Sequence, residues 1–270
     1  MPEPSPLPLF SPSIDPGPSF AELLRQVSPH QLPNAAGSTT GLDIPHGTTV
    51  VAVRYADGVV MAGDRRATAG YTIASRRIDK VFAADDYSGV AIAGAAGPAV
   101  EMVKLFQTQL EHYEKVQGEV LSLEGKANQL GLLVRANLPA AMQGLAVVPL
   151  FAGYDQQRAL GRVFSYDVTG GRYEEHDYQG QGSGSVHARN WIKAGWQEGM
   201  SLDETIELAI RALFAAADED AATGGPDLVR GIFPLVAAID ADGYRALDDA
   251  DVEQRSRALL DGRERGGVAE

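Results

Sequence analysis

The sequence predicts an α+β protein in which two β-sheets pack face to face and helices cover the outside of each, a four-layer αββα sandwich. The order of the elements carries this prediction, because three groups of strand-like runs alternate with two pairs of helical patterns. Sheets and helices must each bury an apolar face, and stacked layers satisfy both. The composition agrees, since 270 residues with 44% apolar side chains are enough for a sizeable core.

The first group of strands begins at Thr48. Asp57-Gly58 lies between two runs rich in β-branched residues, TTVVAVRY and VVMAGD, and this arrangement is a strong signal for a hairpin. A second pair of short strands is expected over 71–75 and 80–83, followed by a strand over 89–94. We expect these strands to form one sheet, covered by the two helices that follow.

Two helical patterns come next. The first begins near Pro98, because proline is tolerated in the first turn of a helix. Apolar residues then recur at roughly helical spacing, at Val100, Val103, Phe106, Leu110 and Tyr113. A second helix is expected over 123–145.

The second half of the chain repeats the order of strands and helices. Strands are expected over 147–155 and 161–168, with one helix after Gly184. Another helix begins at Ser201, which forms a capping box with Glu204. This repetition supplies the second sheet and its covering helices.

The chain ends with one more strand and a charged helix. The strand is expected over 231–240, and Asp242-Gly243 turns the chain back after it. The helix is expected from Asp248 and should end in a disordered tail, RGGVAE.

The first 47 residues differ in composition from the rest. Ten of the 15 prolines lie before Thr48, and this density favours extended, unpaired backbone over a packed element. A short amphipathic helix over 20–27 is the one element expected there. We therefore predict an appendage over 1–47 and a folded domain with its tail over 48–270.

The composition excludes several classes of function. The chain has no cysteine, which removes disulfides and thiolate chemistry, and its five histidines show no metal-ligand spacing. A net charge of −13 without a basic cluster argues against binding to nucleic acid. No stretch reaches the roughly 18 apolar residues of a membrane helix, and the N-terminus lacks the pattern of a secretion signal. We expect a soluble, cytoplasmic protein without metal or cofactor.

Thr48 is a candidate nucleophile at the border between the appendage and the domain. A threonine hydroxyl needs a base, and an N-terminal threonine supplies one through its own α-amino group, whose pKa is roughly 7.7 to 8.0. A cut between Gly47 and Thr48 would create that amine, and Gly47 has no Cβ to hinder the approach of the hydroxyl. Taken alone, Thr48 and Thr49 equally well begin a β-strand.

Asp64 and Lys80 have the chemistry to support such a nucleophile. An ammonium beside Thr48 would favour a neutral α-amine and stabilise a developing alkoxide, while Asp64 would keep the lysine charged and oriented. Taken singly, Asp64 fits an ordinary turn and Lys80 a solvated strand end.

Together these residues form a recognisable pattern. The motifs are GTTVVAVRYADGVVMAGDRRATAG, the lysine at 80, AIAGAAG, GSGS at 182–185 and DEDAATGGPDLVRG. Over residues 47 to about 242 they resemble the catalytic β-type subunits of the 20S proteasome, closest to the actinobacterial form. The resemblance implies the N-terminal nucleophile (Ntn) hydrolase fold and threonine peptidase activity. It also implies that residues 1–47 are a propeptide, removed by self-cleavage between Gly47 and Thr48.

The resemblance assigns roles to matching residues. Thr48 would be the nucleophile and, through its amine, the base, with Asp64 and Lys80 as its supporting pair. The backbone N–H of Gly94 would stabilise the oxyanion. An outer network would position the amine and a water, through Ser183, Asp220 and Thr223. Thr223 departs from the serine common in the family at that place but keeps a hydroxyl.

The resemblance also implies how substrates bind. The peptide would add as a β-strand to the segments at Thr68 and Ala96, with side chains entering pockets. The first specificity pocket would be lined by apolar residues, Ala67, Ile78, Ile92, Ala96 and Ala99. We therefore expect an uncharged residue before the cleaved bond, the P1 position.

The implied partners are those of the family. The subunit would form two heptameric rings between rings of α-type subunits, α7β7β7α7, and a ring ATPase would feed unfolded proteins into the closed chamber. Whether a ubiquitin-like protein tags the substrates stays open.

Three other interpretations stay open at this point. A simpler dodecameric bacterial protease also starts with two threonines, but it has Gly-Asp-Gly where this chain has GDRR. Non-catalytic ring subunits lose the threonine or the lysine, and this chain keeps both. A binding domain with a proline-rich arm would keep its N-terminus uncut.

Overall fold

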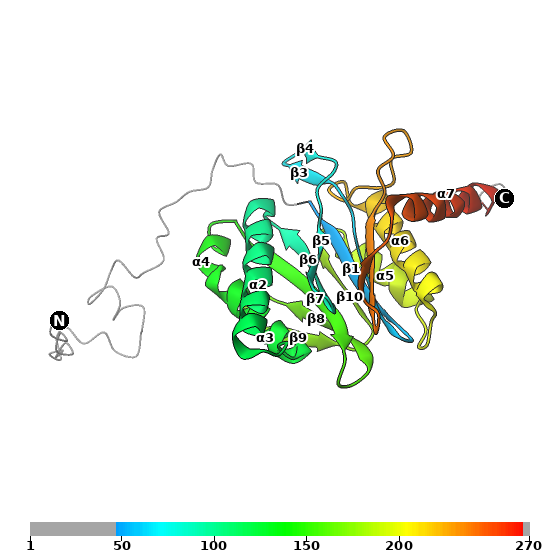
Figure 1. The fold of residues 1–270 in the computed structure, drawn as a ribbon. Helices are drawn as coiled ribbons and strands as arrows, with labels where there is room; N and C mark the ends of the chain where they lie inside the picture. Colours follow the sequence, from blue (N-terminus) through cyan, green and yellow to red (C-terminus); the bar gives the residue numbers. More distant parts are fainter. Residues whose placement is uncertain (1–46, 267–270) are drawn as a thin grey trace, which may run out of the picture. The chain divides into compact units, whose positions relative to one another are not determined.

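The structure, a computed structural model, describes residues 47–266. Two five-stranded antiparallel sheets pack face to face (Figure 1). The first sheet has the order β10 (Tyr178–Gly182), β1 (Thr49–Tyr55), β2 (Gly58–Gly63), β11 (Leu235–Asp240) and β12 (Gly243–Ala246). The second has the order β5 (Val81–Asp85), β6 (Ser88–Gly94), β7 (Val147–Asp155), β8 (Leu160–Tyr166) and β9 (Arg172–Glu175). A two-stranded ribbon projects from them, formed by β3 (Ala67–Ala69) and β4 (Thr72–Ser75).

Helices cover the outer face of each sheet (Figure 1). The second sheet is covered by α2 (Ala96–Gln117) and α3 (Leu123–Ala136), and the short α4 (Leu138–Ala141) follows α3. The first sheet is covered by α5 (Ser185–Gly195) and α6 (Leu202–Glu219), and α7 (Asp249–Gly266) packs beside α6. The predicted four-layer αββα sandwich is therefore confirmed.

Strand β1 illustrates how the sequence builds these layers. Side chains alternate between the two faces of a strand. Val50 and Ala52 join the apolar cluster between the sheets, whereas Val51 and Val53 join the cluster under α5 and α6. All four are fully buried, and burial of a valine contributes about 1.5 to 3 kcal/mol. A continuous β-branched run thus forms a strand that is buried on both faces.

Two local predictions are confirmed in detail. The hairpin of β1 and β2 turns at Ala56-Asp57 and pairs Val51 with Ala62. The capping box before α6 is complete, because Ser201 Oγ accepts from the amide of Glu204 at 3.4 Å and the Glu204 carboxylate accepts from the amide of Ser201 at 2.9 Å.

The predicted pairing of the first strands is wrong. β1 and β2 belong to the sheet under α5 and α6, whereas β5 and β6 belong to the sheet under α2 and α3. The strand found at 72–75 pairs with β3, not with the strand that follows Lys80. Strands β3, β9 and β10 were not predicted, because they are short and only partly apolar. Long-range pairing decides sheet membership, and local periodicity does not report it.

The helix predicted over 123–145 is shorter in the structure. It ends at Ala136, and Pro139 then stands at the start of α4, where its missing N–H breaks no helical hydrogen bond. The strand predicted from residue 231 begins at Leu235, after Pro234. At the other end, α7 continues into the predicted tail as far as Gly266.

Some predictions lie outside the described residues, namely the helix over 20–27 and the last four residues of the tail. Within residues 47–266, no helix has the length and apolar character needed to cross a bilayer.

Candidate active site

Thr48 lies directly before β1 and is only 4% exposed. Its Oγ1 donates a hydrogen bond of 2.6 Å to the carbonyl oxygen of Gly47. A Cβ at position 47 would lie 2.5 Å from Thr68 Oγ1 and 2.6 Å from the carbonyl oxygen of Ala222, so only glycine fits without a shift of its neighbours. The hydroxyl is thus held against the peptide bond that precedes it.

Lys80 lies directly before β5 and is almost completely buried. Its Nζ donates to Asp64 Oδ1 at 2.6 Å, to the carbonyl oxygen of Arg66 at 2.5 Å and to that of Gly47 at 3.1 Å. These three acceptors use all three protons of the ammonium. Burial is the largest influence on the pKa of Lys80 and lowers it; the charge and hydrogen bond of Asp64 counter only part of this effect.

Asp64 follows the last residue of β2 and is fully buried. Besides Lys80, Oδ1 accepts from the amide of Thr49 at 2.8 Å. Oδ2 accepts from the amides of Arg66 at 2.9 Å and Gly224 at 2.8 Å. A buried carboxylate is costly unless it is paired and hydrogen-bonded, and here both oxygens are satisfied. The pair of Asp64 and Lys80 is therefore rigidly held.

A second polar group lies near the carbonyl oxygen of Thr48 and consists of Ser183, Asp220 and Thr223. Ser183 Oγ donates to Asp220 Oδ2 at 2.5 Å and lies 3.4 Å from the carbonyl oxygen of Thr48. Thr223 Oγ1 donates to the same carboxylate oxygen at 2.6 Å. Burial alone would raise the pKa of Asp220, but hydrogen bonds from Ser183, Thr223 and the amide of Ala222 outweigh it and hold the pKa below its ordinary value.

A small pocket opens beside Thr48. It is lined by Gly47, Thr48, Ala67, Ile78, Lys80, Ile92, Ala93, Gly94, Ala96 and Ala99. All five residues predicted for the specificity pocket are among them. Thr68 is not part of this lining but lies against Gly47.

Gly94, the residue predicted to supply the oxyanion N–H, is the last residue of β6. Its φ of +109° is a conformation that favours glycine, and a Cβ there would lie 2.1 Å from the carbonyl oxygen of Ala146. The backbone of Gly94 therefore reaches the pocket at a position that no other residue could occupy without strain.

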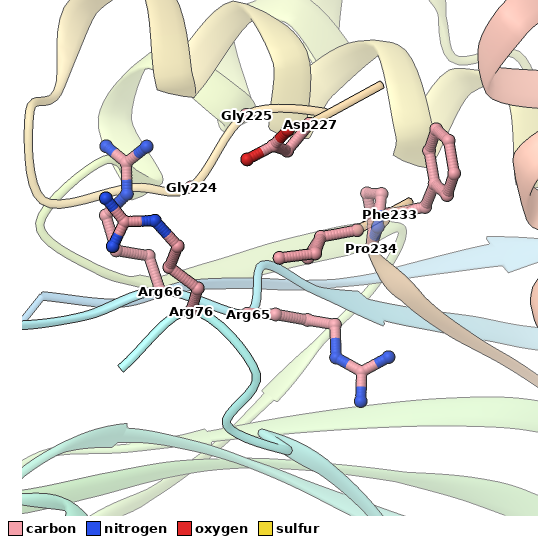
Figure 2. A pocket seen from close by; sticks show the side chains of 9 residues that line it. Arg65, Arg66, Arg76, Gly224, Gly225, Asp227, Phe233 and Pro234 are labelled. Carbon is pink, nitrogen blue, oxygen red and sulfur yellow. The ribbon is translucent and has the colours of Figure 1, made fainter. Parts of the chain in front are cut away.

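A separate pocket lies beside Arg66 and Gly224 (Figure 2). Figure 2 shows Arg66 and Arg76 pointing towards Gly224, whereas the guanidinium of Arg65 points away from it. The amides of Arg66 and Gly224 both donate to Asp64 Oδ2, and both residues also line this pocket. The pocket therefore lies next to the residues that hold Asp64. Its lining contains no hydroxyl, thiol or imidazole that could act as a nucleophile.

The structure brings the predicted site residues together, from the ends of several strands and helices. Sequence reasoning missed several contributors, among them the amide and hydroxyl of Thr49, the carbonyl of Arg66 and the glycine at 184. Thr49 and Arg66 are neighbours of predicted residues, and Gly184 lies within the quoted GSGS motif. Their contributions come mainly from the backbone or depend on the fold, so residue type alone gave no signal.

In the described part of the chain, no group of three or more histidine, aspartate or glutamate side chains is arranged to hold a metal ion. The absence of a cofactor stays a prediction.

Comparison with known proteins identifies the family. A family model described as "Proteasome subunit" matches residues 44–229. A protein of Acidimicrobium ferrooxidans named "Proteasome subunit beta" is 59% identical over 248 residues, which cover 92% of this chain and 91% of the relative. Proteins with the same name come from Streptomyces griseus, 54% identical with 91% and 88% covered, and from Acidothermus cellulolyticus, 55% identical with 92% and 87% covered.

These names do not favour a non-catalytic ring subunit or a dodecameric protease, and they agree with the predicted actinobacterial type. The chain therefore belongs to the proteasome family, as a β-type subunit with the N-terminal nucleophile hydrolase fold.

Proposed function

We propose that this threonine peptidase is made as an inactive precursor and that Thr48 becomes its nucleophile when residues 1–47 are released. One observation carries the proposal: the Thr48 hydroxyl and the Lys80 ammonium both donate to the carbonyl oxygen of Gly47, at 2.6 and 3.1 Å. While the chain is uncut, the nitrogen of Thr48 belongs to an amide and has no basicity. Cleavage therefore creates the base that peptide hydrolysis requires.

The geometry around Gly47 supports self-cleavage by the following steps. Thr48 Oγ1 attacks the carbonyl carbon of Gly47, and the charge that develops on the carbonyl oxygen is stabilised by Lys80. The C–N bond then breaks as the hydroxyl proton passes to the nitrogen, which leaves an ester between Gly47 and the Thr48 side chain. Water hydrolyses this ester, giving a carboxylate on Gly47 and a free hydroxyl and amine on Thr48.

Peptide hydrolysis uses the same atoms. The free α-amine takes the proton of the Thr48 hydroxyl as it attacks, and Lys80, held by Asp64, stabilises the alkoxide. The N–H of Gly94 stabilises the oxyanion of the substrate. Ser183, Asp220 and Thr223 position the amine and a water beside the main chain of Thr48.

The substrate site is the apolar pocket beside Thr48. A substrate peptide adds as a β-strand along the segments at Thr68 and Ala96 and places its P1 side chain between Ala67, Ile78 and Ile92. Lys80 also lines this pocket, but its charge is already paired with Asp64 at 2.6 Å. An uncharged P1 residue therefore suits it best.

The working assembly is the proteasome core, in which the subunit joins α-type subunits and further copies of itself. In this assembly, two seven-membered rings of this subunit lie between two rings of α-type subunits, and the particle is in the cytoplasm. A ring ATPase delivers unfolded proteins, with or without a ubiquitin-like tag. The support is the relatives' shared name, "Proteasome subunit beta".

The test of maturation is the intact mass of the chain after mixing with its α-type partner. The wild-type chain should lose residues 1–47, and Thr48→Ala should remain full-length. Thr205→Val is the control, since Thr205 is also fully buried but lies on α6. Cleavage of Thr48→Ala at the same bond, with wild-type yield in assembled particles, would disprove self-cleavage.

A further inference from the structure

Thr49 is the residue through which the two polar groups of the site meet. It is the first residue of β1 and is fully buried. Its amide donates to Asp64 Oδ1, the oxygen that also accepts from Lys80. Its hydroxyl lies 2.6 Å from Thr223 Oγ1, in the group that contains Asp220. One residue therefore contacts both groups, through its backbone on one side and its side chain on the other.

The direction of each hydrogen bond follows from the proton count. The Asp220 carboxylate can only accept, so Thr223 gives it its single hydroxyl proton. Thr223 Oγ1 must then accept in the contact with Thr49, which makes Thr49 the donor. The Thr49 hydroxyl in turn accepts from the amide of Gly184 at 3.1 Å. The result is one directed series, from Gly184 through Thr49 and Thr223 to Asp220.

The packing around Gly184 leaves no room for a larger residue. A Cβ at position 184 would lie 2.5 Å from Thr49 Oγ1, 2.6 Å from Thr223 Oγ1 and 3.1 Å from Asp220 Oδ2. Glycine at this position therefore allows the series to close. A buried hydroxyl in such a space is costly unless it is hydrogen-bonded, and Thr49 both donates and accepts.

The contacts of Thr49 fix the peptide unit that joins it to Thr48. The Thr49 amide is held by Asp64, and the carbonyl oxygen of Thr48 lies 3.4 Å from Ser183 Oγ. None of these contacts involves residue 47 or any residue before it. They therefore remain when the leader has been released.

We propose that Thr49 is a positioning residue, which couples Asp64 and Lys80 to Asp220 and holds Thr48 in one place before and after the leader is released. The proposal rests on the proposed role of Thr48 as the nucleophile. The hydrogen bonds of Thr49 go to Asp64, Thr223 and Gly184 and not to the carbonyl of Gly47, so it acts through the residues that it holds.

The experiment compares Thr49→Val and Thr49→Ser in the full chain, assembled with its α-type partner. Valine keeps the branched shape and removes the hydroxyl, whereas serine keeps the hydroxyl. Thr49→Val should lower kcat for a fluorogenic peptide by about tenfold or more with little change in KM, since a lost hydrogen bond that acts only on the nucleophile leaves substrate binding intact. Thr49→Ser should restore most of kcat.

Two further variants separate positioning from general stability. Thr205→Val removes the hydroxyl of another fully buried threonine, which donates to the carbonyl oxygen of Ser201 at the N-cap of α6, and should leave kcat unchanged. Thr49→Val combined with Thr223→Val should be no slower than Thr223→Val alone, because Thr49 acts through Thr223. Additive losses would contradict the proposed series.

The outcomes distinguish this inference from the proposed function. Wild-type kcat in Thr49→Val particles, with Thr48→Ala inactive, would overturn the role of Thr49 alone. Activity or processing in Thr48→Ala would overturn the proposed function itself. If Thr49→Val does not assemble, Thr223→Val breaks the same hydrogen bond from its other end, and normal processing and turnover in that variant would refute the proposal.

Discussion

Lys80 Nζ lies 3.1 Å from the carbonyl oxygen of Gly47, although 33 residues separate the two in the sequence. In the uncut chain, the ammonium thus already lies beside the oxygen on which negative charge would develop during self-cleavage. Its remaining protons are held by Asp64 and Arg66, so it is fixed in direction as well as in place. Predictions for both steps of the proposed mechanism follow from this arrangement.

Lys80→Ala should abolish peptide hydrolysis in assembled particles, with a loss on the order of 100-fold or more, because the alkoxide and the amine lose their stabilising charge. Lys126→Ala is a matched control: Lys126 is equally buried and pairs with Asp85 at 2.6 Å, the distance between Lys80 and Asp64. Turnover per particle should be near normal in the control. Near-normal turnover in Lys80→Ala would remove Lys80 from the mechanism.

Gly47→Ala should slow the release of residues 1–47 by about tenfold or more, because its Cβ would push the attacked carbonyl out of line. Peptide hydrolysis by the molecules that do mature should be unchanged, since residue 47 is then gone. Gly97→Ala is the control, because a Cβ at position 97 meets nothing within 4 Å. Processing can be followed by intact mass over time. Equal rates of processing for Gly47→Ala and wild type would show that a Cβ pressed against Thr68 and Ala222 does not disturb the attacked carbonyl.

A fluorogenic peptide panel that varies only P1 should show faster hydrolysis of neutral, mainly apolar residues than of acidic or basic ones. Burial of an unpaired charge costs several kcal/mol, and Ala67, Ile78 and Ile92 offer no charged partner. Particles with Thr48→Ala serve as the blank. A preference for Asp, Glu, Lys or Arg at P1 would mean that this pocket does not receive the P1 side chain.

Stability should depend on pH through Asp220. Its pKa is lower in the folded chain than its ordinary value, so its stabilising effect is present above about pH 3.9 and is lost as the pH falls through the lower, folded pKa. Asp220→Asn should therefore lower Tm near pH 7, and the difference from wild type should shrink as the pH approaches 3. Glu219→Gln, at an exposed neighbour, controls for the loss of a surface charge. A constant difference in Tm over this range would contradict the assigned hydrogen bonds.

The sequence was informative where a signal is local. The hairpin around Asp57 and the capping box at Ser201 depend on residues that are close in the sequence, and both were predicted. Strand pairing is not local: β1 pairs with β10, more than 100 residues later, and this placed β1 in the sheet that was not expected. Short strands such as β3 and β9 lack the apolar alternation that reveals a strand.

In the candidate site, too, local motifs were informative and long-range contacts were not. Its residues were named from motifs. In the structure, Lys80 pairs with Asp64, Lys80 and Thr48 both donate to the carbonyl oxygen of Gly47, and Ser183 of the outer group lies 3.4 Å from the carbonyl oxygen of Thr48. Thr49 escaped notice because its partner, Thr223, is 174 residues away and because a threonine at the start of a strand needs no special explanation. Backbone donors and acceptors, such as the carbonyl of Arg66, carry no sequence signal at all.

The pairing of β1 has one more consequence. New chain ends normally fray, because the first residues of a domain have few neighbours. Here strand pairing begins directly after Thr48. Thr49 pairs with Gly182 of β10, and Val50 pairs with Gly63 of β2 on the other side of β1. A cut before Thr48 therefore breaks no hydrogen bond of the sheet, and the terminus that it creates is clamped between two strands from its second residue. The freshly exposed amine would be as well ordered as an interior atom, which is unusual for the end of a chain.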